Sequence, residues 1–257
     1  MAEAILGGVL AADLAKPEDV RVGEPRIERR QFLCRQYGVQ ASQDNLEATE
    51  STDLVVLAVK PQDLPAVLHQ LHGRLRAGQA ALSIVAGAKV STLTKGLDHP
   101  AVIRVMPNTP AQIGHGMSLW TCSPAIDHEQ RAVAKSILGT IGLEIYVEDE
   151  KYLDMATALS ASGPAYVFLF IEALIDAGVY VGLPRDMARL LALQTVYGST
   201  KLLMETGKHP SELKDMVVSP GGTTAEGLQA LERGGVPAAV VDAVNAAYQK
   251  SIKLGQG

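Results

Sequence analysis

Short apolar runs alternate with amphipathic stretches over residues 1–149 of the chain. Residues 54–59 form an unbroken apolar run, which is typical of a parallel strand covered on both faces. Comparable runs predict strands at 80–85, 101–106 and 143–147, and a weaker one at 20–22. Amphipathic periodicity predicts helices at 27–37, with Gly38 as the stop, at 61–78 and at 127–138. This alternation indicates βαβ units and a Rossmann-like, doubly wound parallel sheet.

The pattern changes after residue 149, beyond which no convincing strand follows. Helical periodicity covers most of residues 151–253. Its interruptions fall at 163–164, 182–184, 207–210 and 219–222. Ser162 followed by Pro164 fits a helix start with proline in the first turn. We therefore predict a dinucleotide-binding α/β domain at 1–149 and an all-helical domain at 150–257.

One apolar run in the helical half, residues 165–181, is as long as the shortest membrane spans. Glu172 and Asp176 lie near its middle, four residues apart and so on one face of a helix. Charges at that depth are costly in lipid. We therefore expect a helix that is buried on most sides and carries a polar stripe, as in the core of an oligomer.

Composition narrows the class of protein. The chain has 257 residues, 47% of them apolar, which is enough for a large core. A net charge of −5 and the lack of a basic stripe argue against a nucleic-acid partner. The only two cysteines, Cys34 and Cys122, are far apart in sequence, and no signal-peptide pattern opens the chain. A reduced, cytoplasmic protein is the simplest expectation.

The most informative segment is Ser-Pro-Gly-Gly-Thr-Thr-Ala-Glu at residues 219–226. Gly221 and Gly222 allow a tight turn and let a ligand approach the peptide groups. Thr223 stands three residues before Glu226, the spacing of a capping box at a helix start. The unpaired N–H groups of a helix N-terminus can hold a small anion such as a carboxylate. An ordinary loop with an N-cap is the alternative.

Candidate cofactor residues follow three of the predicted strands, because ligands of open parallel sheets bind past the carboxyl ends of the strands. Asn108 has an amide that can donate and accept beside a nicotinamide or a ribose. Lys60 can face a phosphate, although a lysine after a strand is often simply solvated. The remaining candidates are small or apolar: Ala58, Val59, Pro61, Ala86 and Gly87.

The glycine fingerprint of a Rossmann domain does not occur in the given residues. Such a domain opens with a strand and G-x-G-x-x-G leading into a helix, whereas residues 1–8 already read as that helix. Glu24 lies near the position that binds a ribose 2′-hydroxyl, and Arg26, Arg29 and Arg30 follow it. The acid favours NAD and the arginines favour NADP, so both cofactors remain open; a solvated charge cluster is the alternative.

Other chemistries find little support. His69 and His72 are three residues apart on a predicted helix, but no third metal ligand is near in sequence, so we expect no metal site. There is no G-x-S-x-G elbow and no paired cysteine motif. A reaction in which a cofactor carries the chemistry fits best.

Five segments, in order and spacing, resemble pyrroline-5-carboxylate reductase over essentially the whole chain. They are AVKPQ at 58–62, RVMPNTP at 104–110, LSASGPAY at 159–166, GLP at 182–184 and SPGGTT at 219–224. The resemblance implies NADPH- or NADH-dependent reduction of a cyclic imine, 1-pyrroline-5-carboxylate, to proline. It also implies a Rossmann domain, a helical dimerisation domain, and homodimers or decamers.

The resemblance and the loop together predict the site. The peptide groups of Gly222, Thr223 and Thr224 would hold the substrate carboxylate, with Ser219 and Gly221 shaping the loop. The Thr224 hydroxyl would bond the ring nitrogen as the catalytic contact, and the proton would come from solvent or through Thr224.

The chain departs from the family at its start, where members usually have a strand and a glycine-rich turn that ends in Gly-Asn-Met-Ala-Glu-Ala. Residues 1–4 match the tail of that turn, so we expect Met1 to be an internal methionine or the start of a shortened form. Two other functions stay open at this stage. One is a non-catalytic oligomeric remnant of the family, and the other a β-hydroxyacid-type dehydrogenase, whose N-x-x-K lysine motif is not found.

Overall fold

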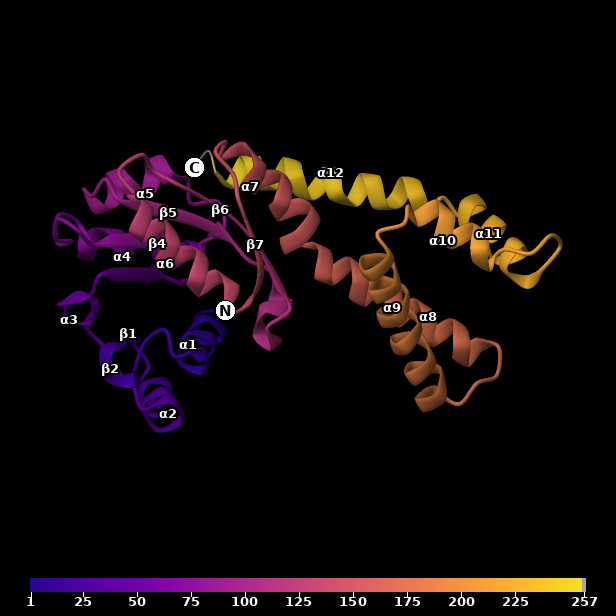
Figure 1. Cartoon of the computed structure of the whole chain (residues 1–257), viewed down its shortest axis with the longest axis horizontal. Coiled ribbons are helices and arrows are strands. Elements are labelled where there is room, and N and C mark those ends of the chain that lie inside the picture. The colour runs from indigo at the N-terminus through magenta and orange to yellow at the C-terminus, as the bar shows by residue number, and fades with distance from the viewer. Residues whose placement is uncertain (256–257) are drawn as a thin grey trace. The chain divides into compact units, whose positions relative to one another are not determined.

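The computed structural model describes residues 1–255, which form two compact units: Met1–Ser162 together with the chain from Ala247 on, and Gly163–Ala246. The larger sheet of the first unit has the strand order β3-β4-β5-β6-β7 (Figure 1). Its strands are β3 (Leu54–Leu57), β4 (Ala80–Ser83), β5 (Val102–Met106), β6 (Gly116–Cys122) and β7 (Gly142–Tyr146). All neighbours are parallel except β5 and β6, which are antiparallel. The Rossmann-like fold is confirmed, and the one antiparallel pair involves β6, a strand that the sequence did not predict.

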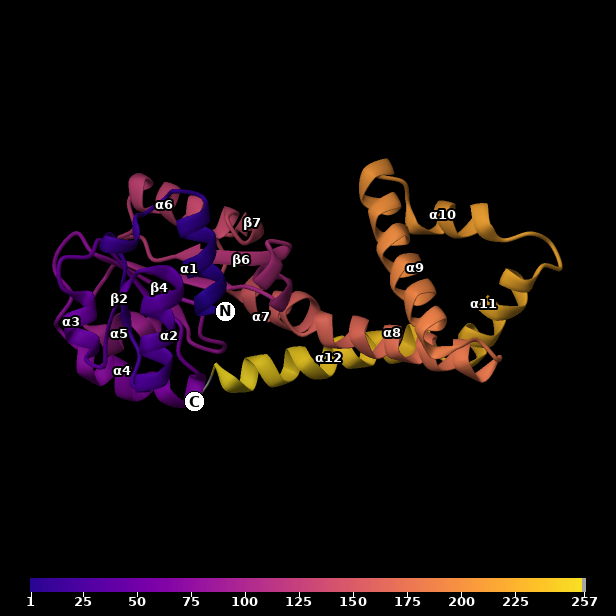
Figure 2. The same cartoon turned by 90° about the horizontal axis from the view of Figure 1, so that it is seen from below.

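Each face of this sheet is covered by helices, as Figure 2 shows for α6 and α4. One face packs on α1 (Ala2–Ala11) and α6 (His128–Gly139), through Ile5 and Leu138. The other packs on α4 (Leu64–Leu71) and α5 (Val90–Leu97), through Leu68 and Leu93. Alternate residues of β4 and the first residues of β5 therefore enter two different apolar clusters, as expected for a sheet between helical layers.

The sheet is interrupted next to β3. Strands β1 (Arg21–Gly23) and β2 (Gln40–Ser42) pair only with each other, beside α2 (Ile27–Tyr37) and α3 (Asn45–Thr49), and form a separate parallel ribbon. A doubly wound sheet normally continues through this position. The outer edge of β3 consequently has no partner strand in the described residues, and Val56 is 37% exposed. The prediction that this strand is covered on both faces is wrong at Val56.

Several boundaries differ from those predicted. The helix expected at 61–78 is a 3-10 turn (Pro61–Asp63) followed by α4, which ends at Leu71 because Gly73 adopts a positive φ of 65°. The strand β6 was missed because Gly116, Ser118 and Thr121 interrupt its apolar pattern. Helices α3 and α5, strand β2 and the 3-10 turns Pro17–Asp19 and Thr109–Ile113 were not predicted either.

The described part of the chain beyond residue 149 contains helices and no strand, which confirms the predicted change of character. The helices are α7 (Lys151–Ala156), a π-helical turn (Thr157–Ala161), α8 (Gly163–Tyr180), α9 (Arg185–Thr206), α10 (Pro210–Val217), α11 (Thr223–Arg233) and α12 (Val236–Leu254). An interruption at Gly234–Gly235 was missed. The compact units divide after Ser162, and the boundary predicted at 149/150 stays a prediction.

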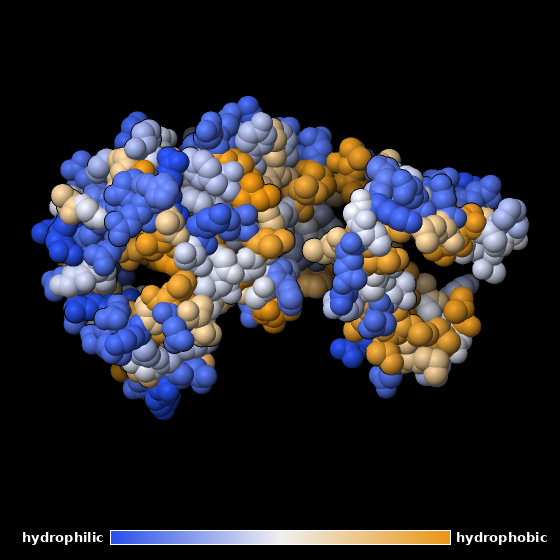
Figure 3. Space-filling model, viewed as in Figure 1, coloured by the Kyte–Doolittle hydropathy of each residue, from blue (hydrophilic) through white to orange (hydrophobic). Residues whose placement is uncertain are grey.

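Helix α8 is exposed within the single chain, and the expectation that an oligomer buries most of its sides stays a prediction. None of its residues is buried, and Phe168 and Leu169 are 62% and 67% exposed. Figure 3 shows apolar side chains gathered over α8 and α9. The stretch Lys151–Tyr180 is long and apolar enough to cross a membrane by length and composition alone. An apolar surface of this kind also marks a protein–protein interface.

Candidate active site

The loop before α11 is a tight turn that requires its glycines. The Gly222 N–H donates to the Ser219 carbonyl at 2.9 Å, with Pro220 and Gly221 in the two central positions. Gly221 has a φ of 67°, as the second central residue of a type II turn requires. A Cβ on Gly222 would overlap the Ser219 hydroxyl oxygen. The predicted turn is therefore present, and both glycines have a steric reason.

The start of α11 has no side-chain cap, so the predicted Thr223–Glu226 capping box is wrong. Gly222 takes the N-cap position in an extended conformation, with φ −82° and ψ 167°. Thr223 is then the first helical residue, and its hydroxyl is not placed to accept from its own first turn. The Glu226 N–H makes the first intrahelical bond, to the Gly222 carbonyl at 3.4 Å. The N–H groups of Thr223, Thr224 and Ala225 precede that bond and can receive an anion.

The two threonines differ in exposure. Thr224 is half-buried, whereas Thr223 is exposed. Neither hydroxyl makes a hydrogen bond to another described residue of the chain. A half-buried hydroxyl beside uncapped N–H groups suits a ligand that has both a carboxylate and a nitrogen.

Beyond the carboxyl end of β3 the residues become exposed and lead into a 3-10 turn. Ala58 and Val59 are half-buried, and Lys60 and Pro61 are exposed. The Lys60 carbonyl accepts from the Asp63 N–H at 2.9 Å, which begins the 3-10 turn and leaves the lysine side chain in solvent. Their cofactor roles stay predictions.

Beyond β4, Gly87, which follows the half-buried Ala86, lies beside the last turn of α12. Gly87 has a φ of 78°, and a Cβ there would lie 3.2 Å from the Leu254 Cβ. The positive φ and the close approach of α12 therefore explain why a glycine stands here. The cofactor contacts of Ala86 and Gly87 stay predictions.

Asn108, beyond β5, is held by the protein itself. Its Oδ1 accepts from the Met117 N–H at 2.8 Å, and its Nδ2 lies 3.3 Å from both the carbonyl and the hydroxyl oxygen of Ser160. The amide thus joins β6 to the π-helical turn. Ser160 was not singled out from sequence, although it lies in the LSASGPAY segment that carried the resemblance. The structure brings Asn108 and Ser160 together across 52 residues of sequence.

Glu24 follows β1 and is paired locally. Its Oε1 accepts from the Arg26 N–H at 3.0 Å and from Arg26 Nε at 3.1 Å. Partial burial opposes ionisation, but the bonds from Arg26 outweigh it and hold the pKa of Glu24 below its usual range. Arg30 donates to the carbonyls of Glu24 and Pro25, both at 2.8 Å. The loop therefore presents an ionised carboxylate beside a guanidinium, which leaves both cofactor preferences open.

Two features of the first unit fit a bound dinucleotide. The Glu24 carboxylate can accept ribose hydroxyls, and helix α1 has no side-chain cap, so its first N–H groups can receive a phosphate. Glu3 ties α1 to α2 by accepting from Arg29 and, at 2.8 Å, from the Tyr37 hydroxyl; the bond from Arg29 is the main reason that the pKa of Glu3 is lowered. Glu24 thus fits a ribose, and the start of α1 fits a phosphate.

Two family models match the chain, one in its α/β part and one in its helical part. Residues 150–254 match the family model "Pyrroline-5-carboxylate reductase dimerisation", and residues 1–87 match "NADP oxidoreductase coenzyme F420-dependent". The chain is 45% identical to the pyrroline-5-carboxylate reductase of Synechocystis over 256 residues, covering 100% of this chain and 95% of the relative. It is 39% identical to that of Escherichia coli, covering 99% and 94%.

Solved structures show the same likeness. The pyrroline-5-carboxylate reductase of Coxiella burnetii has a TM-score of 0.90 at 33% identity, covering 98% of this chain and 94% of that one. A Plasmodium falciparum pyrroline carboxylate reductase with NADP bound has a TM-score of 0.89, also at 33% identity with coverages of 98% and 94%.

Proposed function

The chain belongs to the pyrroline-5-carboxylate reductase family, and from that premise we propose that the residues of its turn and strand ends have the roles predicted from its motifs. It is an NAD(P)H-dependent oxidoreductase that reduces the cyclic imine 1-pyrroline-5-carboxylate to proline. The observation that supports the site best is the uncapped start of α11 behind the Ser219–Gly222 turn.

The substrate chemistry matches this turn. The N–H groups of Thr223 and Thr224 bind the carboxylate at the positive end of α11. The Thr224 hydroxyl, on the half-buried side, bonds the ring nitrogen and orients the imine. Reduction of a protonated imine develops no new anion, so the chain needs no oxyanion hole. NAD(P)H supplies the hydride when bound, and the protein contributes mainly orientation. The proton reaches the nitrogen from solvent or through Thr224.

The function is tested by following NADPH absorbance in the purified full chain at saturating cofactor. We expect absorbance to fall only when 1-pyrroline-5-carboxylate is present, and proline to accumulate in equal amount. The same assay with NADH gives the cofactor preference. A lack of imine-dependent oxidation with either cofactor, in a chain that also carries a glycine turn, would contradict the function.

The enzyme oligomerises through a dimerisation domain. We propose a homodimer as the basic unit and a decamer as its larger assembly, in the cytoplasm and without a nucleic-acid or membrane partner. The exposed apolar residues of α8 support such an interface, because large apolar patches are unusual on soluble monomers.

Replacing Phe168 with Asp should weaken the oligomer about tenfold, since a charge would be desolvated in an apolar contact. Sedimentation over a concentration series measures the dissociation constant. Val133, which is 45% exposed on α6, provides a matched control in Val133→Asp. Equal dissociation constants for the Phe168 variant and the parent would show that α8 lies outside the interface.

A further inference from the structure

Arg104 is a buried cation in β5 that the proposed substrate and cofactor contacts do not use. Its side chain is 2% exposed, and its neighbours Ile103 and Val105 are at most 1% exposed. A guanidinium stays charged at physiological pH, and removing it from water is costly. Apolar residues often replace a buried ion pair without loss of stability. The fold alone therefore does not explain why an arginine stands here.

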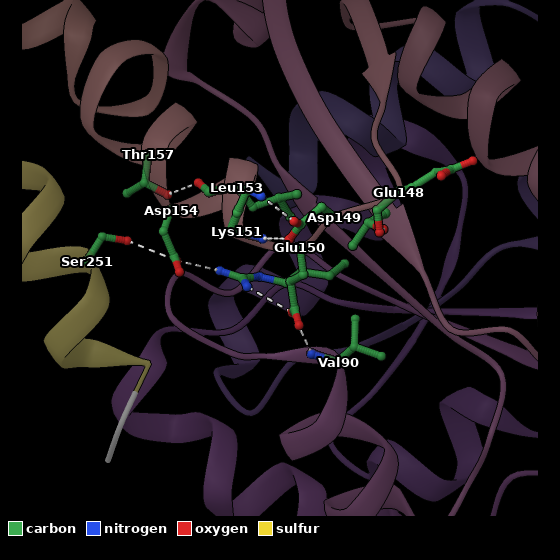
Figure 4. Close-up of polar contacts among 11 residues, drawn as sticks. Val90, Glu148, Asp149, Glu150, Lys151, Leu153, Asp154, Thr157 and Ser251 are labelled. Carbon is green, nitrogen blue, oxygen red and sulfur yellow. Dashed lines mark hydrogen bonds and ion pairs between the residues drawn. The ribbon is translucent and has the colours of Figure 1, made fainter.

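Two carboxylates at the start of α7 hold this arginine, Glu150 from the N-cap position and Asp154 from the helix itself. Arg104 Nη1 donates to Glu150 Oε1 at 2.8 Å, and Nη2 donates to Asp154 Oδ1 at 3.1 Å. Glu150 and Asp154 are four residues apart, and Figure 4 shows both side chains on the same side of α7. The two arms of the guanidinium thus fix the position and the rotation of the first turn of α7 against the sheet.

The same carboxylates bind two further segments of the first unit. Glu150 Oε1 also accepts from the Val90 N–H at 2.8 Å, at the start of α5. Asp154 Oδ1 also accepts from the Ser251 hydroxyl at 3.2 Å, in the last turns of α12 (Figure 4). Ser251 is 3% exposed. Arg104 is therefore the buried centre of a network that joins β5, α5, α7 and the end of α12.

The helix that Arg104 holds leads directly into the π-helical turn. Within it, the Ser162 N–H donates to the Thr157 carbonyl at 2.9 Å, five residues back. The Thr157 hydroxyl donates to the Leu153 carbonyl at 2.7 Å, which links the turn to α7. Asn108, four residues after Arg104, contacts Ser160 in the same turn. Single π-helical turns are rare and often lie at functional sites.

We infer that Arg104 is a positioning residue for hydride transfer. Through Glu150 and Asp154 it fixes the rotation of α7, and so keeps Ser160 against Asn108 beyond the carboxyl end of β5. Cofactors of open α/β sheets lie at that edge. A slip of the helix by one residue would turn Ser160 about 100° away from Asn108. The inference rests on the function proposed above.

The test uses the full chain with Arg104→Met or Asp154→Asn. Lys151→Met is the matched control, because it removes an exposed ion pair of the same helix, with Asp149, and leaves the Arg104 network intact. Amide hydrogen exchange of residues 157–162 is measured without cofactor. NADPH binding is titrated, and kcat per cofactor site is measured with ordinary NADPH and with NADPH deuterated at the transferred position.

We expect both variants to exchange at residues 157–162 about tenfold faster than the parent. We expect kcat per cofactor site to fall about tenfold, with a larger isotope effect, while the NADPH dissociation constant stays within about threefold. Arg104→Lys keeps the charge but not the two-armed geometry, so it should recover only part of kcat. Lys151→Met should match the parent in every measurement.

A merely structural role would lower the melting temperature and the number of binding sites without changing kcat per site, the isotope effect or exchange in the turn. That result in Asp154→Asn, the milder variant, would overturn the inference. The exchange measurement needs no turnover. Unchanged exchange refutes the positioning role, whereas a parent chain that carries a glycine turn and exchanges as expected but reduces no imine would contradict the function instead.

Discussion

NADPH binding should tighten by about two to four decades when a β-strand and a G-x-G turn are added ahead of Met1. Helix α1 begins at Ala2 without a side-chain cap, and the sheet is interrupted between β1 and β3. A strand placed there would pair with the open edge of β3 and cover Val56. Its turn would add N–H donors to the pyrophosphate, and two charge-assisted hydrogen bonds contribute about 1.5–3 kcal/mol each.

Fluorescence titration of NADPH against the two forms measures this difference. The control is an extension of the same length in which both glycines of the turn are valines, which completes the sheet but blocks close approach of the phosphates. We expect the valine form to melt at a higher temperature than the chain without an extension. Its affinity for NADPH should remain below that of the form with both glycines. Equal dissociation constants for the extended form and the 257-residue chain would contradict the prediction.

Thr224→Ala should lower kcat/KM about ten- to a hundredfold while the melting temperature changes little. The hydroxyl is half-buried and has no hydrogen-bond partner among the described residues, so its removal leaves no protein group unpaired. A hydrogen bond to a charged partner contributes about 1.5–3 kcal/mol, and the protonated imine is charged. Steady-state kinetics and thermal melting, both at saturating NADPH, separate the two effects.

The neighbouring residue provides the control. Because Gly222 rather than Thr223 is the N-cap of α11, Thr223→Ala should leave both the melting temperature and kcat/KM close to the parent values. Thr224→Ser keeps the hydroxyl and should recover most of the activity. If Thr224→Ala retained normal kcat/KM and Thr223→Ala lost it, the roles of the two threonines would have to be exchanged.

The sequence by itself was sufficient wherever the cause of a structure is local. Helix α2 spans residues 27–37, as predicted, because Gly38 follows and adopts the left-handed conformation that ends helices. The turn at 219–222 was predicted because Pro220 and Gly221 have the backbone preferences that it needs. The alternation of strands and helices also predicted the fold class, because each of these elements follows from a local pattern of apolar and polar residues. The order of five short motifs then led to the family.

Only the tertiary structure decided the features whose partners are distant in sequence. Asn108 was a predicted cofactor contact, but its bonds to Ser160 span 52 residues. Arg104 received no role from the sequence, since its carboxylates lie 46 and 50 residues away and the Ser251 contact to Asp154 spans 97. The N-cap of α11 is Gly222 because the turn leaves that residue in an extended conformation. The spacing of Thr223 and Glu226 did not show this. Periodicity and propensity describe neighbours along the chain, whereas these contacts arise only when packing brings separate elements together.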